Sequence, residues 1–203
     1  ENDVLKQHEC KSYIHILTIP SVCKELNTDQ HLYEVAWQES RKLYYDFDNI
    51  DYDKSEADEF ISKFIRIIRT ELDIIIEDDG IIIKKNEGKT KTGEVTDKIH
   101  SLHIILTKHK MKYKEQMLFS KYLNDKYEID VDTNVYKKNQ LFRFLGQSKA
   151  KHKIKTVNYY DGENINIRKS MINVTDGCKQ TTFTKTYNIK KDYTDDKNTN
   201  KRK

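Results

Sequence analysis

The segment between residues 132 and 149 combines an acidic residue with several basic and aromatic residues. The carboxylate of Asp132 can bind a divalent cation, and the side chains of Arg143 and Lys149 can neutralise the phosphate oxygens that such a cation leaves exposed. A site that handles nucleotides needs this combination of charges. The segment therefore predicts nucleotide chemistry, with further carboxylates supplied from elsewhere in the chain.

The first candidate partners are Asp46 and Asp48, at the end of a segment typical of a β-strand. Side chains alternate along a strand, so the two carboxylates are expected on one face with their Cα atoms roughly 7 Å apart. Tyr45 and Phe47 are then expected on the opposite, packed face. Two divalent ions held about 4 Å apart can activate an attacking hydroxyl and stabilise the leaving oxygen of a phosphoryl transfer. Asp132 would complete this set of carboxylates.

An isolated pair of this kind is more often a solvated strand end than a metal site. Asp51 and Asp53 repeat the same spacing, and we expect them in a loop or at the start of a helix because they follow the strand. Ser101 and His103 form another candidate pair, since alternation on a strand places both on one face, where they can donate hydrogen bonds to a triphosphate. A single histidine is more often structural, and His100 fits that description. The residues expected on the opposite, core face are Leu102, Ile104 and Leu106.

Charge is distributed unevenly, although the formal net charge is only +4. Seven Lys or Arg and no acidic residue lie between positions 137 and 155, whereas seven acidic residues and one lysine lie between positions 46 and 59. This segregation favours an acidic metal site next to a basic track for a polyanion. The lysines predicted to contact DNA are Lys137, Lys138, Lys151 and Lys153. The aromatic residues predicted to stack on bases are Tyr136, Phe142 and Phe144. A merely solubilising basic face is the alternative.

Other signals exclude several classes of protein. The cysteines Cys10, Cys23 and Cys178 are widely separated, which argues against a disulfide framework and against a zinc site. Gly88-Lys89-Thr90 resembles the end of a phosphate-binding loop, but Ile83 stands where that motif requires glycine. No apolar segment is long enough for a signal core or a membrane span. We therefore expect an intracellular protein, and a chain cut from a longer polypeptide.

The apolar pattern predicts one α+β domain over residues 1–187, whose sheet carries the polar residues on one face, and a disordered basic tail over residues 188–203. One helix is expected to begin at Ser55, with Asp58 completing a capping box, and a second covers residues 111–126. The face expected to pack comprises Phe60, Ile61, Phe64, Ile65, Ile68 and Leu72 in the first helix, and Leu118, Tyr122 and Leu123 in the second. The expected strands cover residues 13–19, 41–48, 73–77, 81–84, 101–107, 141–145, 156–160, 165–168 and 181–187. Strands 73–77 and 81–84 are expected to form a hairpin.

In chain order, these fragments resemble the three motifs of the archaeo-eukaryotic primase superfamily, which are a D-x-D/E pair, an S-x-H and a late acid. They match Asp46/Asp48, Ser101/His103 and Asp132. The third segment is the most specific, because residues 132–149 resemble the pattern D-x-x-V-Y-x-x-N-x-x-F-R-x-x-x-S-S-K. The matching positions are Asp132, Val135, Tyr136, Asn139, Phe142, Arg143, Ser148 and Lys149. The chain is also similar to the primase-helicases of poxviruses and other large DNA viruses. The resemblance covers about residues 41–155.

The resemblance implies a primase-type catalytic domain with an RRM-like half, an N-terminal α/β unit and an active site on a sheet. Asp46, Asp48 and Asp132 would hold two Mg²⁺ or Mn²⁺ ions, with no zinc. Ser101, His103, Arg143 and Lys149 would contact the nucleotide. The implied partners are a single-stranded DNA template, NTP or dNTP, and a superfamily 3 helicase on the same polypeptide or in a complex. A viral protein would act in a replication compartment of the cytoplasm or nucleus.

Two positions depart from the pattern. Gln147 replaces the first serine of the S-S-K element, and the lysine often found two residues before the motif serine is Ile99, with Lys98 one place off. A slip of one residue on a strand reverses the face of a side chain. Two other functions remain open at this point. One is a catalytically inactive primase-like module that binds DNA for a replicative helicase, and the other is a two-metal nuclease.

Overall fold

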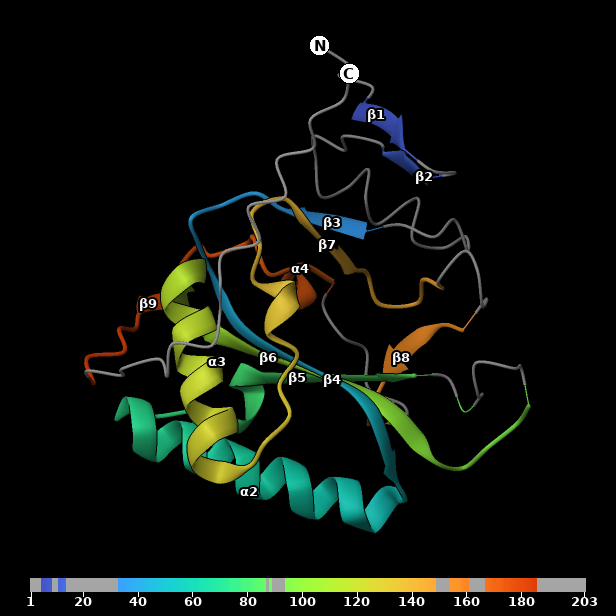
Figure 1. The fold of residues 1–203 in the computed structure, drawn as a ribbon, viewed down its shortest axis with the longest axis horizontal. Helices are drawn as coiled ribbons and strands as arrows, with labels where there is room; N and C mark the ends of the chain where they lie inside the picture. Colours follow the sequence, from blue (N-terminus) through green and yellow to red (C-terminus); the bar gives the residue numbers. More distant parts are fainter. Residues whose placement is uncertain are drawn as a thin grey trace, which may run out of the picture.

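The computed structural model describes residues 33–86, 88, 94–148, 154–160 and 167–185, together with two short strands, β1 (Leu5–His8) and β2 (Lys11–Tyr13) (Figure 1). The predictions for Lys149, Lys151 and Lys153, for the tail over residues 188–203, and for Cys10 and Cys23 lie outside these residues, as does most of the strand expected at 13–19. Among the described residues, no helix is long and apolar enough to cross a membrane.

The larger sheet has the order β4-β6-β5-β8 and is antiparallel throughout this path. Its strands are β4 (Ser40–Tyr52), β6 (Ile99–Lys112), β5 (Ile81–Asn86) and β8 (Thr156–Asn158), and β9 (Lys179–Gln180) pairs in parallel with β6. The strands expected at 41–48, 81–84 and 101–107 are therefore confirmed, and β4 and β6 are longer than expected. The strand expected at 156–160 is confirmed only in its first part. This sheet carries the predicted site.

Helix α2 (Lys54–Leu72) begins two residues earlier than the expected capping box would place it. Asp53 is the N-cap, its side chain accepts a hydrogen bond of 2.9 Å from the backbone N–H of Glu56, and the Glu56 side chain accepts one from the backbone of Asp53. The prediction of Ser55 as the helix start was wrong, while Asp53 lies at the start of a helix as expected. Asp51 instead belongs to β4, so its placement in a loop was also wrong.

Helix α2 covers the face of β4 that carries Tyr45 and Phe47, and it runs beneath the sheet in Figure 1. The ring of Phe64 packs edge-on against Tyr45 at 4.8 Å and against Phe47 at 5.0 Å, and Phe60 also contacts Phe47 edge-on at 5.0 Å. Such edge-to-face pairs add stability beyond the burial of apolar area. The apolar helix face and its packing on the sheet are as predicted from the sequence.

Helix α3 (Tyr113–Tyr127) packs by a face that overlaps only in part with the one expected, because Leu123 is buried as predicted. Its buried residues are Gln116, Phe119, Ser120 and Leu123, whereas Leu118 and Tyr122 are only partly buried. The side-chain amide of Gln116 donates a 2.7 Å hydrogen bond to the main-chain carbonyl of Tyr44. Since β4 is an edge strand of the larger sheet, this bond satisfies a carbonyl that has no strand partner on that side. A polar residue therefore occupies the buried helix face, which the apolar pattern could not show.

Glu71, near the C-terminal end of α2, forms hydrogen bonds with the C-terminal part of α3. Its buried carboxylate accepts hydrogen bonds from the hydroxyl of Tyr122 at 2.7 Å and from the ammonium groups of Lys126 at 2.9 Å and Lys185 at 2.5 Å, and also from Tyr127. Burial raises the pKa of Glu71, but these four hydrogen bonds outweigh it and lower the pKa to about 2. The carboxylate is thus stabilised in its ionised form.

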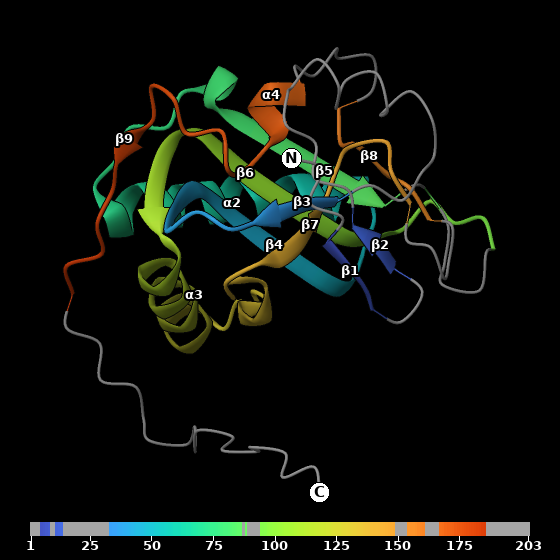
Figure 2. The ribbon, with the colours of Figure 1, turned by 90° about the horizontal axis from the view of Figure 1, so that it is seen from above.

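A smaller sheet pairs β3 (Tyr33–Ala36) with β7 (Gln140–Arg143) in antiparallel register (Figure 2). Phe142 of β7 contacts Tyr44 at 5.0 Å, which places β7 over the face of β4 opposite to α2. The strand expected at 141–145 is confirmed in its first part. The short helices η1 (Asp78–Gly80), η2 (Thr133–Val135) and α4 (Ile167–Ser170) complete the described elements.

Three of the expected strands are wrong. Residues 74–77 carry no strand, because Asp73 ends α2 in a left-handed conformation at φ 51° and the following carbonyls bond to side chains instead. Arg69 donates to the carbonyl of Ile76, and a ring nitrogen of His109 lies 2.9 Å from that of Ile75. Residues 167–170 form the helical turn α4, and residues 181–185 have no strand. A β-branched residue favours a strand only where a neighbouring strand is available.

Buried charged side chains hold residues 168–173 against the sheet. The carboxylate of Glu34 accepts hydrogen bonds from the N–H groups of Ile172 at 2.8 Å and Asn173 at 2.7 Å. The ammonium group of Lys42 donates to the carbonyls of Arg168 at 3.2 Å and Lys169 at 2.9 Å. Burial raises the pKa of Glu34 and lowers that of Lys42 to about 8. The side chains of Glu34 and Lys42 therefore hold this late segment by hydrogen bonds to its backbone groups.

Candidate metal centre

Three carboxylates converge on one face of the larger sheet. Asp46 and Asp48 lie two residues apart on β4, and Asp132 is the N-cap of η2. Each offers a carboxylate oxygen, and these oxygens lie within 4.8 Å of one another. The main-chain N–H of Asp132 donates a 2.9 Å hydrogen bond to the carbonyl of Asp46, and its carboxylate accepts one of 2.8 Å from Asn134. The grouping of these residues, which lie far apart in the sequence, agrees with the prediction.

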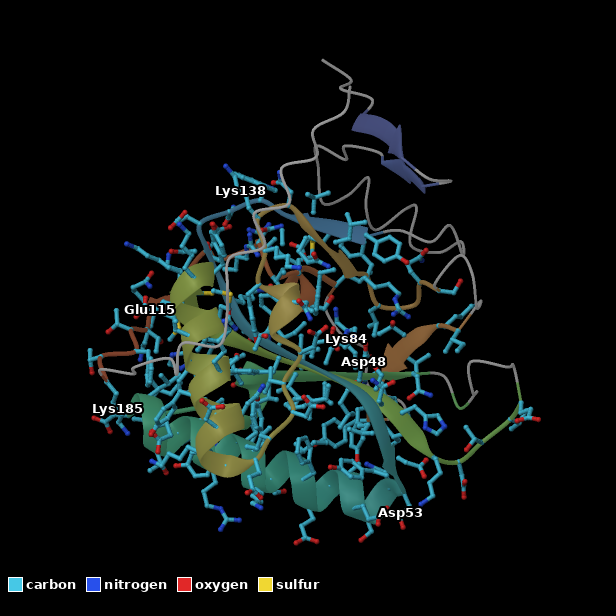
Figure 3. All side chains as sticks on the ribbon, viewed as in Figure 1. Asp48, Asp53, Lys84, Glu115, Lys138 and Lys185 are labelled. Carbon is cyan, nitrogen blue, oxygen red and sulfur yellow. The ribbon has the colours of Figure 1, made fainter. Side chains whose placement is uncertain are left out.

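The strand register continues this site across the sheet. Asp46 pairs with His103 of β6, His103 pairs with Lys84 of β5, and Lys84 pairs with Asn158 of β8. Directly paired residues point to the same face, so four polar side chains form a row across four strands. A second row begins with Asp48, which pairs with Ser101. Figure 3 shows Asp48 and Lys84 over this sheet.

His103 is buried next to the carboxylates. Its Nε2 lies 3.1 Å from Oδ1 of Asp46, and its ring lies 5.2 Å from that of Phe142. The other ring nitrogen, Nδ1, is buried and has no hydrogen-bond partner within the described residues. When protonated, the His103 ring would pair electrostatically with the Asp46 carboxylate at this separation. Its contact with a phosphate stays a prediction.

Arg143 brings positive charge to the same face. Its Nη1 donates a 3.2 Å hydrogen bond to the carbonyl of Ile154, and its buried Nε has no partner among the described residues. Burial lowers the pKa of Arg143, and the charges of Tyr33, Asp46 and Asp48 act in the opposite direction. The guanidinium group therefore lies within electrostatic reach of two of the three carboxylates.

Lys84 is a residue of this face that the motifs did not reveal. It is 1% exposed, and its ammonium group lies 3.3 Å from the carbonyl of Ser170, 3.5 Å from that of Arg143 and 4.9 Å from the centre of the Phe142 ring. Burial lowers the pKa of Lys84 to about 7, although the charge of Glu34 partly opposes this effect. The available signal was the pair of lysines that ends strand 81–86, because alternation must turn one of them towards the core.

Two residues near the motif serine lie away from the carboxylates. The ammonium group of Lys98 lies 3.6 Å from the carboxylate of Glu56, at the N-terminus of α2, and Ile99 is buried. The shift of the lysine by one position thus turns it towards the helix-covered side. His100 lies 3.4 Å from the carboxylate of Asp51 and is not part of the row that contains His103.

The prediction of base stacking by aromatic residues of the third motif was wrong. Tyr136, Phe142 and Phe144 are all buried in the core, so their faces are inaccessible to a base. The hydroxyl of Tyr136 donates to the carbonyl of Tyr44 at 2.7 Å, and its ring contacts that of Tyr44 at 5.1 Å. Lys137 and Lys138 are exposed, and Figure 3 places Lys138 far from Asp48.

The three carboxylates could hold a metal ion. They offer hard oxygen ligands on separate chain segments, and the buried Asp46 is fixed by both its strand and His103. Mg²⁺ and similar cations prefer such ligands and complete their coordination with water or substrate phosphates. No protein-family model matches the chain, and no curated protein is significantly similar to it. The assignment of function therefore depends on the residues and geometry of this site.

Proposed function

We propose that this protein is the catalytic domain of a DNA primase or primase-polymerase, which joins nucleoside triphosphates on a single-stranded DNA template. The observation that carries the proposal is the meeting of Asp46, Asp48 and Asp132 within 4.8 Å, next to His103 and near Arg143. These residues come from the three segments that resemble the primase motifs. A solvated acidic cluster would need neither the buried histidine nor the arginine.

The topology of the larger sheet supports the proposal. The chain runs β4, α2, β5, β6 and α3 in sequence, and β6 lies between β4 and β5. This is the order of the first five elements of an RRM-like β-α-β-β-α-β unit, whose first and third strands are adjacent. In place of a final strand, the segment containing Asp132 lies beside β4 through its hydrogen bond to Asp46. The third carboxylate thus reaches the site from the sheet edge.

The chemistry requires no nucleophile from the protein. The 3′-hydroxyl of the primer gives its proton to solvent water, and its oxygen forms a bond to the α-phosphorus. The bond between that phosphorus and the oxygen bridging to the β-phosphate breaks, and pyrophosphate leaves. Two Mg²⁺ or Mn²⁺ ions, when bound, would supply charge neutralisation and a more acidic hydroxyl. Asp46, Asp48 and Asp132 would hold the ions, and Arg143 would neutralise the triphosphate. Ser101 and His103 would orient the phosphates.

Primer-extension and de novo priming assays on Asp46→Asn test this proposal. The loss of one metal-binding carboxylate should lower synthesis by about a hundredfold or more, a loss of the size found for single electrostatic groups in active sites. Asp51→Asn is the matched control, because Asp51 lies on the same strand and, within the described residues, belongs to no carboxylate group that could hold a metal. Full activity in Asp46→Asn in both assays would exclude the proposed function.

Two further measurements distinguish the alternatives. Incubation with labelled single strands and Mn²⁺, without nucleotides, would reveal degradation if the carboxylates served a nuclease. A titration of nucleotide with and without Mg²⁺ would show no metal-dependent affinity if the domain only bound DNA. A superfamily 3 helicase on the same polypeptide or in a complex remains the proposed partner, and its presence is tested by copurification.

A further inference from the structure

An exposed tryptophan lies just before β4, whose central residues belong to the candidate metal centre. Trp37, the only tryptophan of the chain, follows β3 and is 60% exposed. Large aromatic side chains are usually buried in a core or in an interface, because each removes a large apolar area from water. An exposed tryptophan on an ordered turn is therefore a candidate contact for a ligand.

A fully buried arginine holds this turn in place. The guanidinium group of Arg41 donates to the carbonyl of Gln38 at 2.8 Å, to that of Lys137 at 3.2 Å and to that of Ala36. The carbonyl of Ala36 also accepts a 2.9 Å bond from the N–H of Asn139. One side chain thus joins the turn that carries Trp37 to the turn over residues 137–139. The exposed indole therefore lies on a turn whose backbone carbonyls accept hydrogen bonds from other groups of the protein.

The two turns joined by Arg41 carry basic side chains. Lys137 and Lys138 are exposed on the second turn, and Lys112, which pairs with Ser40 across the strands, is exposed beside the first. Glu39 is the acidic residue between Trp37 and β4. These joined segments thus carry three exposed lysines and one exposed glutamate, which is an excess of positive charge. We name this group of residues (Trp37, Lys112, Lys137 and Lys138) the Trp37 platform.

We propose that the Trp37 platform binds single-stranded nucleic acid, with one base stacked on the indole and the neighbouring phosphates neutralised by the lysines. Binding of single strands without sequence preference combines these two elements, an aromatic face and a basic path for the backbone. The inference rests on the proposed function, because it identifies where the template strand is held. It also replaces the stacking role that the buried Tyr136, Phe142 and Phe144 cannot perform.

The other exposed aromatic ring among the described residues is a weaker candidate. Tyr160 packs edge-on against Tyr159 with ring centres 5.1 Å apart, and the ammonium group of Lys54 lies 5.3 Å from its ring. Its face is thus already engaged with a cation of the protein. Among the described residues, Trp37 has no ring partner in either an aromatic pair or a cation–π contact.

The platform and the carboxylates should contribute to different steps. Figure 3 shows Lys138 and Asp48 on different parts of the molecule, so the platform and the metal centre are separate sites. Loss of the platform should then raise the concentration of template needed for half-maximal synthesis and leave the maximal rate unchanged. Loss of a carboxylate should lower the maximal rate and leave the template concentration for half-maximal synthesis unchanged. This difference separates a binding surface from the chemical site.

Fluorescence of the single tryptophan provides a direct test. The full chain is titrated with an oligodeoxythymidylate of about 12 nucleotides, within the range of site sizes for single-strand binding domains, without metal or nucleotide. Stacking of a base on Trp37 should quench its emission over the same concentration range in which the fluorescence anisotropy of a labelled oligonucleotide rises. If anisotropy reports binding while the tryptophan emission stays constant, the platform is not the binding site. If neither signal changes, the inference is also wrong.

Variants establish which groups are responsible. Trp37→Ala should weaken binding about 5- to 100-fold, the range expected from the loss of one base–aromatic contact, and Trp37→Phe should restore most of it. Replacing both Lys137 and Lys138 with alanine should reduce the slope of log affinity against log salt by about 0.7 for each lysine. Lys63→Ala, an exposed lysine on α2, is the matched control. Unchanged affinity in Trp37→Ala would overturn the inference.

The same titration separates the two proposals. Asp46→Asn should quench normally while it loses synthesis. If the wild-type chain quenches on binding but makes no product, the proposed function fails and the platform stands. If synthesis is normal while Trp37→Ala needs no more template than wild type, the platform fails and the proposed function stands.

Discussion

The two faces of β4 differ in what their side chains do, although the residues alternate along one strand. Tyr45 and Phe47 pack edge-on against the aromatic rings of α2, whereas Asp46 and Asp48 point to the other face with His103 and Lys84. The α2 face obtains its stability from apolar burial. The opposite face holds partly desolvated charges close together, an arrangement that opposes stability unless partners or ligands compensate it. One strand thus supplies both the support and the reactive groups.

Removal of a ring from the α2 face should have the largest effect on folding. Phe47→Ala deletes a side chain that is 1% exposed and contacts two rings, and should lower the free energy of unfolding by about 3 to 5 kcal/mol. Urea denaturation followed by circular dichroism measures this change. Asp46→Asn, one position earlier, should change the free energy by much less. Equal losses for the two variants would show that both faces are structural.

Glu71 tests whether a charge on the helix side contributes to stability. Glu71→Gln should lower the free energy of unfolding by about 2 kcal/mol at pH 7, because it weakens hydrogen bonds to an ionised acceptor. The pKa of Glu71 is lowered in the folded state to about 2, so its contribution is complete above pH 4.5 and is lost as the pH falls towards 2. The difference between variant and wild type should therefore narrow over this range. A constant difference would contradict this assignment.

Lys84 provides the corresponding test on the face of the carboxylates. Its pKa is lowered to about 7 in the folded state, so between pH 7 and the usual value of 10.5 the unfolded chain binds the additional proton. The contribution of Lys84 to stability should rise with pH over this interval. Lys84→Met should remove that rise and be relatively more stable at pH 6 than at pH 9. Denaturation series at both pH values measure it, and parallel pH profiles for variant and wild type would refute it.

The smallest effect is expected for Lys98→Ala. Lys98 and Glu56 form a partly exposed ion pair of 3.6 Å, and such pairs contribute about 0 to 1 kcal/mol. Primer synthesis should stay within about twofold of wild type, a change equivalent to less than 0.5 kcal/mol, because Lys98 is directed to α2 rather than to the carboxylates. A larger loss of synthesis with unchanged stability would mean that Lys98 moves to the other face when a nucleotide binds.

The sequence predicted the parts of the fold in which a single period extends over many residues. Alternation in β4 and β6 assigned Asp46 and His103 to one face correctly, and the helical spacing of Phe64, Ile65 and Ile68 identified the packed face of α2. The segment at 74–77 has the composition of a strand but no partner strand. Its carbonyls are in contact with the side chains of Arg69 and His109 instead. Neither contact can be recognised from a local sequence pattern.

The site was predictable to the extent that it consists of spaced motifs. Asp132 could be connected with Asp46 only through resemblance, because the hydrogen bond that joins their backbones depends on the path of a loop. Lys84 was missed because the choice between two adjacent lysines depends on strand register. The stacking role of Phe142 was wrong because an aromatic residue next to an arginine can equally belong to the core, and only tertiary packing decides.

The bonds from Glu34 to the backbone of Ile172 and Asn173 have a consequence for the growing chain on the ribosome. Glu34 belongs to β3, whereas its partners lie more than a hundred residues later. Until those residues have left the exit tunnel, the carboxylate has no N–H donors and Lys42 has no carbonyl acceptors. The domain can therefore close only after residue 173 has left the exit tunnel, and nascent chains in which it has not emerged should remain sensitive to protease.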